Sequence, residues 1–194
     1  MNLVERAKKL VLKPKEEWPV IAAEIHSVQD LYTKYVMILA AIPAVAAFVG
    51  FSFIGVSGFG YSYRVPIASG LAQMVLQYLL SLGGVYVMAL IIDALAPSFG
   101  GEKSFPQAIK VAAFFPTASW LAGVFYLIPA LSILAILGGL YSLYLLYLGL
   151  PLLMKAPEDK AIPYTVVVII VAIVVMVVIG IVSSLVVPGS VRGF

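Results

Sequence analysis

The chain has 194 residues, of which 63% are hydrophobic and only 11% are charged, and its net charge is +3. Soluble domains carry about 25% charged residues, so this much apolar surface cannot be buried in a water-soluble core and must face lipid. The absence of cysteine and the single histidine, His26, exclude disulfides, zinc–thiolate sites, iron–sulfur clusters and multi-histidine metal sites. We therefore expect an integral membrane protein with no cofactor and no metal.

The first 34 residues contain two short amphipathic patterns separated by Pro14. Apolar residues recur there at helical spacing, with charged residues between them. The residues suited to a lipid surface are Arg6, Lys8, Lys9, Lys13, Lys15 and Trp18. Such helices lie in the headgroup plane, with tryptophan as an anchor. We favour this arrangement; the alternative is a helix pair packed on the membrane domain.

Five apolar stretches are long enough to cross the roughly 30 Å hydrocarbon core. They cover residues 35–53, 67–95, 108–128, 131–150 and 164–187. Ser27 and Asp30 form a capping box before the first stretch, and Pro43 and Pro116 interrupt the first and third. The sequence predicts an all-α polytopic integral membrane protein. We expect a cytosolic amphipathic segment, 1–34, followed by a five-span helical bundle, 35–194.

Positive charge is distributed unevenly between these stretches. Ten basic residues lie in the N-terminal segment and in the loops after the second and fourth spans, whereas only Arg64 and Arg192 lie on the opposite side. The positive-inside rule then places the N-terminus in the cytoplasm and the C-terminus outside. Membrane topology therefore accounts for the pI of about 9.0. We expect a multi-pass cell-membrane protein in contact with lipids, with no nucleic-acid partner.

Asp93 is the one acidic residue inside an apolar run of the second span. An intramembrane carboxylate is by default a functional hypothesis, here a proton or cation site. Asp93 also lies within about one turn of the cytoplasmic end of its helix, where it can reach water or pair with Lys103 or Lys110. We favour the structural interpretation, in which such a partner neutralises the charge.

Polar side chains repeat along the second and fourth spans. The second carries Ser69, Gln73, Gln77 and Ser81, and the fourth carries Tyr141, Tyr144 and Tyr147. A stripe of this kind more often hydrogen-bonds neighbouring helices than lines a substrate path. The tyrosine hydroxyls need partners, so we expect them to face the bundle; lining a pore is the alternative.

Three runs of sequence form a recognisable set. They are Lys13-Pro14-x-x-x-Trp18, Asp93-Ala-Leu-Ala-Pro97-Ser-Phe99-Gly100-Gly101 and Tyr141-x-x-Tyr144-Leu-Leu-Tyr147-x-Gly149-Leu-Pro151. Together they resemble the prokaryotic branch of the Yip membrane-protein family, whose eukaryotic members are named for interacting with Ypt/Rab GTPases. The resemblance implies a five-span domain with a cytosolic N-terminus. The eukaryotic relatives carry longer N-terminal regions, so the 34 residues here leave little room for a GTPase-binding domain.

Two functions fit these observations. The first is a non-enzymatic membrane organiser that contacts lipids, other membrane proteins or a second copy of itself. The second is a small oligomeric transporter or channel for an ion or small solute, using Asp93 and the polar stripe of the second span. An enzyme ranks last, because the sequence has no His-Glu-x-x-His motif, phosphate-binding loop or dinucleotide fingerprint.

Overall fold

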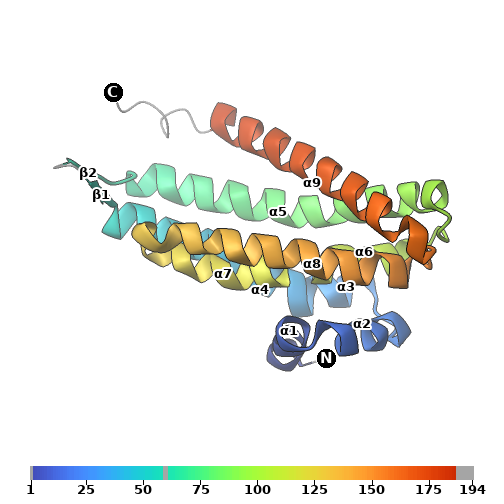
Figure 1. Cartoon of the computed structure of the whole chain (residues 1–194). Coiled ribbons are helices and arrows are strands. Elements are labelled where there is room, and N and C mark those ends of the chain that lie inside the picture. The colour runs from blue at the N-terminus through green and yellow to red at the C-terminus, as the bar shows by residue number, and fades with distance from the viewer. Residues whose placement is uncertain (1, 59–60, 187–194) are drawn as a thin grey trace.

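The chain folds into helices that run alongside one another, with a short helical hairpin on one side of them (Figure 1). The computed structural model describes residues 2–58 and 61–186. Its α-helices are α1 (Leu3–Leu12), α2 (Pro14–Ala23), α3 (Val28–Leu31), α4 (Met37–Val49), α5 (Ile67–Leu95), α6 (Phe105–Phe114), α7 (Thr117–Ala122), α8 (Ala135–Leu153) and α9 (Glu158–Val186). Other helical turns are the π-helical η1 (Tyr32–Val36) and η2 (Gly50–Ile54) and the 3₁₀-helical η3 (Ala96–Phe99), η4 (Gly123–Leu127) and η5 (Pro129–Leu134).

Four helical segments in the described part of the chain are long and apolar enough to cross a bilayer. They are Val28–Ile54, Ile67–Phe99, Phe105–Leu127 and Pro129–Leu153. The prediction of a polytopic helical membrane protein is therefore confirmed. The helix α9 adds 29 further residues. The fifth expected span, 164–187, ends at a residue outside the described part, so the count of five spans stays a prediction.

The capping box predicted at Ser27 is present. The backbone N–H of Asp30 donates to Ser27 Oγ at 3.0 Å, and Ser27 Oγ donates to the Asp30 carboxylate at 2.8 Å. This pairs an N–H that the helix itself leaves free and places negative charge at the positive end of the helix dipole. The first membrane segment consequently begins at Val28 rather than at the expected residue 35, and it continues through η1 into α4.

Pro116 divides the third membrane segment into α6 and α7. Proline has no N–H to donate to the preceding turn, and α6 ends at Phe114, two residues before it. The segment is the most enclosed of the four, because 67% of its apolar window is buried against 33% in each of the others. The α6–α7 segment is therefore the centre around which the other helices pack.

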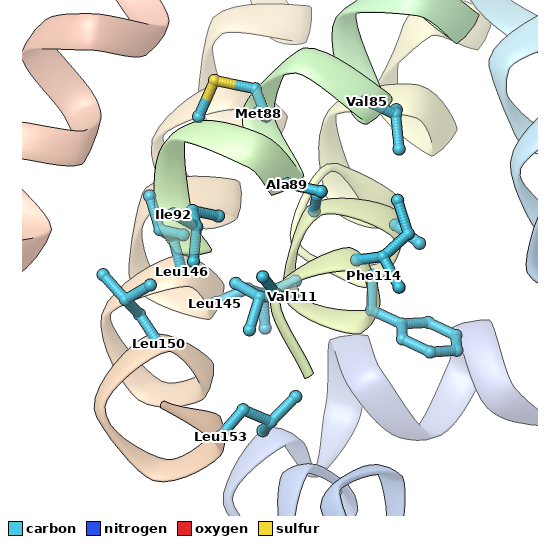
Figure 2. Close-up of a cluster of buried hydrophobic side chains, with 14 of the residues drawn as sticks. Val85, Met88, Ala89, Ile92, Val111, Phe114, Leu145, Leu146, Leu150 and Leu153 are labelled. Carbon is cyan, nitrogen blue, oxygen red and sulfur yellow. The ribbon is translucent and has the colours of Figure 1, made fainter. Parts of the chain in front are cut away.

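The core lies where α5, α6 and α8 meet (Figure 2). The side chains labelled there are Val85, Met88, Ala89 and Ile92 from α5, Val111 and Phe114 from α6, and Leu145, Leu146, Leu150 and Leu153 from α8. All are at most 6% exposed. Close packing of these apolar side chains fixes the three helices relative to one another.

The segment between the first two membrane segments contains a short hairpin. Strands β1 (Val56–Gly58) and β2 (Tyr61–Tyr63) pair in antiparallel fashion, with Val56 opposite Tyr63. Gly55 has φ of +81°, a conformation that glycine adopts without a Cβ penalty. This left-handed residue turns the chain out of η2 and into the hairpin.

The helix α9 contacts α5, α8 and η3. Near its start, the Tyr164 hydroxyl donates to the Ile92 carbonyl at 2.6 Å, and the Tyr164 ring stacks on Phe99 with centroids 4.9 Å apart. These contacts anchor the first turns of α9 at the end of the bundle where α5 passes into η3 (Figure 1).

Candidate functional site

The N-terminal hairpin of α1 and α2 packs against α6, α7 and α8 (Figure 1). Leu10, Trp18 and Ile21 are at most 1% exposed. The alternative arrangement, a helix pair packed on the membrane domain, is thus the one observed. Trp18 was expected as an interfacial anchor, and this expectation is wrong because its indole is enclosed by the bundle.

Gly149 of α8 makes room for Trp18. A Cβ atom built on Gly149 would lie 2.5–2.6 Å from three atoms of the indole ring, closer than van der Waals contact allows. Nearby, the Tyr141 hydroxyl donates to the Val11 carbonyl at 2.7 Å. Both contacts join α8 to the hairpin. They explain why a tryptophan near the N-terminus and a tyrosine–glycine pattern in the fourth span occur in the same sequence.

Arg6 holds the hairpin together from inside. Its guanidinium donates to Glu17, which lies in α2, and to Glu24, the C-cap residue of α2. Arg6 itself is 8% exposed. The prediction that Arg6 faces a lipid surface is therefore wrong: its charge is used within the hairpin. A guanidinium bound by two carboxylates is a strong and geometrically specific contact.

Glu24 joins Arg6 to the single histidine. His26 Nε2 lies 2.8 Å from Glu24 Oε2, and the Glu24 side chain is 35% exposed. Burial raises the pKa of Glu24, but the hydrogen bonds from Arg6 and His26 outweigh it and lower the pKa below its usual value. The carboxylate is therefore held in its ionised form.

Lys110 of α6 caps the end of α2. Its Nζ donates to the carbonyls of Ile21, Ala22 and Glu24, each at 2.9 Å, although the residue is only 3% exposed. The last carbonyls of a helix have no partner within the helix and carry the negative end of its dipole. All three ammonium hydrogens are used, so this lysine attaches the hairpin to the bundle.

Sequence reasoning did not find this group of Arg6, Glu17, Glu24, His26 and Lys110. One signal was available: basic and acidic residues on two short helices separated by Pro14 suggest a hairpin held by ion pairs. The pairing with Lys110 had no such signal, because more than 80 residues separate the two partners. Among the described residues, no group of His, Asp and Glu side chains could hold a metal ion.

Two small cavities flank Glu24. One, of about 180 Å³, is lined by residues of the α2 end and the α6 start, including His26, Gln107 and Lys110. The other, of about 130 Å³, lies between α1 and α2 beside Arg6 and Lys9. Both are therefore bounded by the charged residues of the hairpin, and neither is lined by the polar stripe of α5.

The remaining predicted lipid-surface residues, Lys8, Lys9, Lys13 and Lys15, are exposed. Lys9 pairs with Glu5 at 2.8 Å and Lys13 with Glu16 at 3.1 Å. The outward side of the hairpin also carries apolar side chains; Val4, Leu12 and Val20 are 71%, 66% and 46% exposed. This side combines cations with apolar groups.

Asp93 is 8% exposed, and its Oδ1 has no hydrogen-bond partner in the described part of the chain. The expected partner Lys110 is bound to carbonyls of α2 instead, and Lys103 is exposed. The structural pairing favoured from sequence is therefore not present. A buried carboxylate without a partner is unfavourable, so Asp93 stays a candidate for function.

The polar stripe of α5 does not form a lined path among the described residues. Gln73 and Gln77 are exposed, Ser69 is half-buried, and Ser81 Oγ donates to the Tyr78 carbonyl of its own helix at 2.7 Å.

Tyrosines that were not singled out join α5 to the first membrane segment. The Tyr78 hydroxyl donates to the Met37 carbonyl at 3.0 Å, and the Tyr32 hydroxyl donates to the Leu82 carbonyl at 2.9 Å.

The three tyrosines of α8 divide into two groups. Tyr141 is half-buried and bound to α1, as described above, whereas Tyr144 and Tyr147 are 38% and 40% exposed. The expectation that all three face the bundle is therefore wrong for the last two. At a spacing of three residues, successive side chains rotate around the helix, so only the first meets the hairpin.

The Phe99-Gly100-Gly101 motif is a tight turn against the start of α9. Gly100 has φ of +73°, and a Cβ on Gly101 would lie 2.7 Å from the Met154 carbonyl oxygen. The Glu102 N–H donates to that same oxygen at 2.8 Å. The two glycines are thus needed for a left-handed turn and a close backbone approach.

Comparison with known proteins shows the family of this chain. The Yip1 domain matches residues 8–179. The chain belongs to the Yip1 family. Inner membrane protein YohC of Escherichia coli strain K12 is 31% identical over 156 residues, which cover 78% of this chain and 80% of YohC. YohC of Escherichia coli O6:H1 matches to the same extent. No solved structure matches this Yip1-family chain.

Proposed function

We propose that this Yip1-family protein is a non-enzymatic membrane organiser whose docked α1–α2 hairpin presents a basic surface to anionic lipid headgroups. The observation that carries the proposal is the two-sided hairpin. One side, with Leu10, Trp18 and Ile21, is buried against the bundle. The other exposes Lys8, Lys9, Lys13 and Lys15 beside apolar side chains. An amphipathic surface of this composition suits the boundary between headgroups and acyl chains.

The orientation expected from the distribution of basic residues supports the same function. It places the hairpin at the cytoplasmic leaflet, whose anionic lipids attract basic segments. Each lysine near such a surface contributes about 1 kcal/mol. Lys8 and Lys15 form no ion pair within the described residues, so their charge is available to lipid. Docking fixes the hairpin that carries these charges, which reduces the ordering cost of binding.

The test compares two double variants of the full-length protein that remove the same charge. Lys8→Gln with Lys15→Gln alters the hairpin, whereas Lys103→Gln with Lys160→Gln alters exposed lysines elsewhere on the side expected to be cytoplasmic. We expect the first to weaken binding of phosphatidylglycerol by about 30-fold, because the loss of two lysines removes roughly 2 kcal/mol of binding free energy. Equal weakening by both variants would show that binding depends on net charge alone and not on the hairpin, which would contradict the proposal.

The second candidate function is an oligomeric transporter or channel, and the observation that favours it is the unpartnered Oδ1 of Asp93. Buried carboxylates in membrane segments mark ion and proton sites in many transporters. The test is ion or proton flux into vesicles containing the wild-type protein or the Asp93→Asn variant. Flux that is lost in the variant while the expressed amount is unchanged would place transport first.

A further inference from the structure

The cavity between the end of α2 and the start of α6 is lined by Glu24, Gln107 and Lys110, and its lysine is already engaged within the protein. The cations that line or adjoin it are already engaged: Lys110 with three carbonyls of α2, and Arg6 with Glu17 and Glu24. Gln107 Nε2 also donates, to the Ala22 carbonyl at 3.3 Å. All three ammonium hydrogens of Lys110 are therefore used, and none is left in these walls to hold an anion.

Acceptors, in contrast, are left over. Gln107 Oε1 is buried and has no partner in the described part of the chain. The Glu24 carboxylate is partly exposed at 35% and is held ionised. His26 also lines this cavity, with its Nε2 2.8 Å from the Glu24 carboxylate. An amide oxygen and a carboxylate in one cavity are complementary to a group that carries several N–H donors and positive charge.

The position of the cavity in the bundle limits which molecules can present such a cationic group. His26 precedes the first membrane segment, which begins at Val28, and Pro106 lies in the first turn of the third segment, which begins at Phe105. The cavity thus lies at the ends of two membrane segments, at the depth of lipid headgroups. Its volume of about 180 Å³ is below the roughly 300–1,000 Å³ of ordinary ligand pockets. Only a small group fits.

We infer that this cavity binds a primary ammonium group, presented either by the ethanolamine headgroup of a phospholipid or by a free amine. Gln107 Oε1 and the Glu24 carboxylate accept from the ammonium. A quaternary ammonium, which has the same charge but no N–H, is a poor ligand for the same walls. The site is separate from the exposed lysines of the proposed function and takes a zwitterionic rather than an anionic lipid.

The experiment measures the lipid-dependent rise in the unfolding temperature of the full-length protein in detergent. The ligands are short-chain phosphatidylethanolamine, its N-methylated forms, phosphatidylcholine, phosphatidylglycerol and free ethanolamine. We expect phosphatidylethanolamine to stabilise most, and the apparent affinity to fall roughly tenfold or more as N–H donors are replaced by methyl groups. A stabilisation by free ethanolamine at equal concentration would assign the site to soluble amines.

Two variants of one residue then act in opposite directions. Gln107→Leu removes the acceptor and should abolish the preference for phosphatidylethanolamine, whereas Gln107→Glu adds charge and should strengthen it. Glu102→Gln, an exposed carboxylate at the same end of the bundle, is the control and should change nothing. If Gln107→Leu fails to fold, Gln107→Glu still tests whether residue 107 determines the preference for phosphatidylethanolamine. Equal stabilisation by phosphatidylcholine, or an unchanged preference in Gln107→Glu, would overturn the inference, while the phosphatidylglycerol titration reports separately on the lysine surface.

Discussion

Docking of the hairpin depends on the absence of a side chain at Gly149, and Gly149→Ala tests this directly. The new Cβ would lie 2.5–2.6 Å from three atoms of the Trp18 ring, so the indole or α8 must shift. Inserting one methyl group into a well-packed contact costs about 1–3 kcal/mol. The expected consequence is a hairpin that separates from α8 more often, while the buried contacts between α5, α6 and α8 persist.

Limited trypsin digestion of the full-length protein in detergent measures this opening, because the hairpin carries five of the chain's basic residues before Pro19. If cleavage proceeds through the opened form, its rate follows the opening equilibrium. A change of about 1–3 kcal/mol then corresponds to roughly 5- to 150-fold faster cleavage. Gly139→Ala is the matched control: it lies on the same helix, and no atom is within 4 Å of its added Cβ. Equal cleavage rates for Gly149→Ala and wild type would refute the packing argument.

Three further predictions follow from the charged groups. Lys110→Met should lower the free energy of hairpin opening by about 1.5–3 kcal/mol, because three helix-terminal carbonyls lose their donor. An unchanged rate of tryptic cleavage would contradict this. The pKa of Glu24 is lowered in the folded state, so its contribution to stability is present above the pKa of the unfolded state, about 4.3, and is lost as pH falls through the pKa of the folded state. Glu24→Gln should flatten this acid dependence of the unfolding temperature. Asp93→Asn should not lower the unfolding temperature, because the buried Oδ1 has no partner to lose; a marked loss of thermal stability would show that a structural pairing exists.

Local features were predictable from sequence. The capping box at Ser27 involves residues three positions apart, and the break at Pro116 follows from a missing N–H on one residue. The membrane segments follow from length and hydropathy, since lipid requires the backbone to pair its polar groups internally. Features of this kind depend on a few neighbouring residues and therefore appear in the chain itself.

Features that depend on distant residues were not predictable. Arg6 and Trp18 have the composition of a lipid-facing surface, and only the position of Gly149 and of Glu24 shows that they point inward. The same holds for Lys110, which pairs with carbonyls of α2 rather than with Asp93. An amphipathic helix can bury its apolar side against lipid or against protein with similar gain, so its pattern alone does not distinguish the two.

We propose that the hairpin, which docks on the bundle with one face, turns its charged face toward the cytoplasmic headgroups. The chain has no cysteine, so single cysteines at adjacent positions report this without a background. Ala7→Cys lies on the buried face, at 6% exposure, and Lys8→Cys on the exposed face. Because the two positions are neighbours, they lie at nearly the same depth.

The decisive measurement is the labelling of these two variants by a membrane-impermeant maleimide, in inside-out vesicles and in intact cells of a bacterial expression host. We expect Lys8→Cys to react at least tenfold faster than Ala7→Cys, and only in inside-out vesicles. Tenfold corresponds to protection of Ala7→Cys on the order of one kcal/mol or more. Equal reactivity of the two positions, or labelling from outside in intact cells, would contradict this orientation of the hairpin.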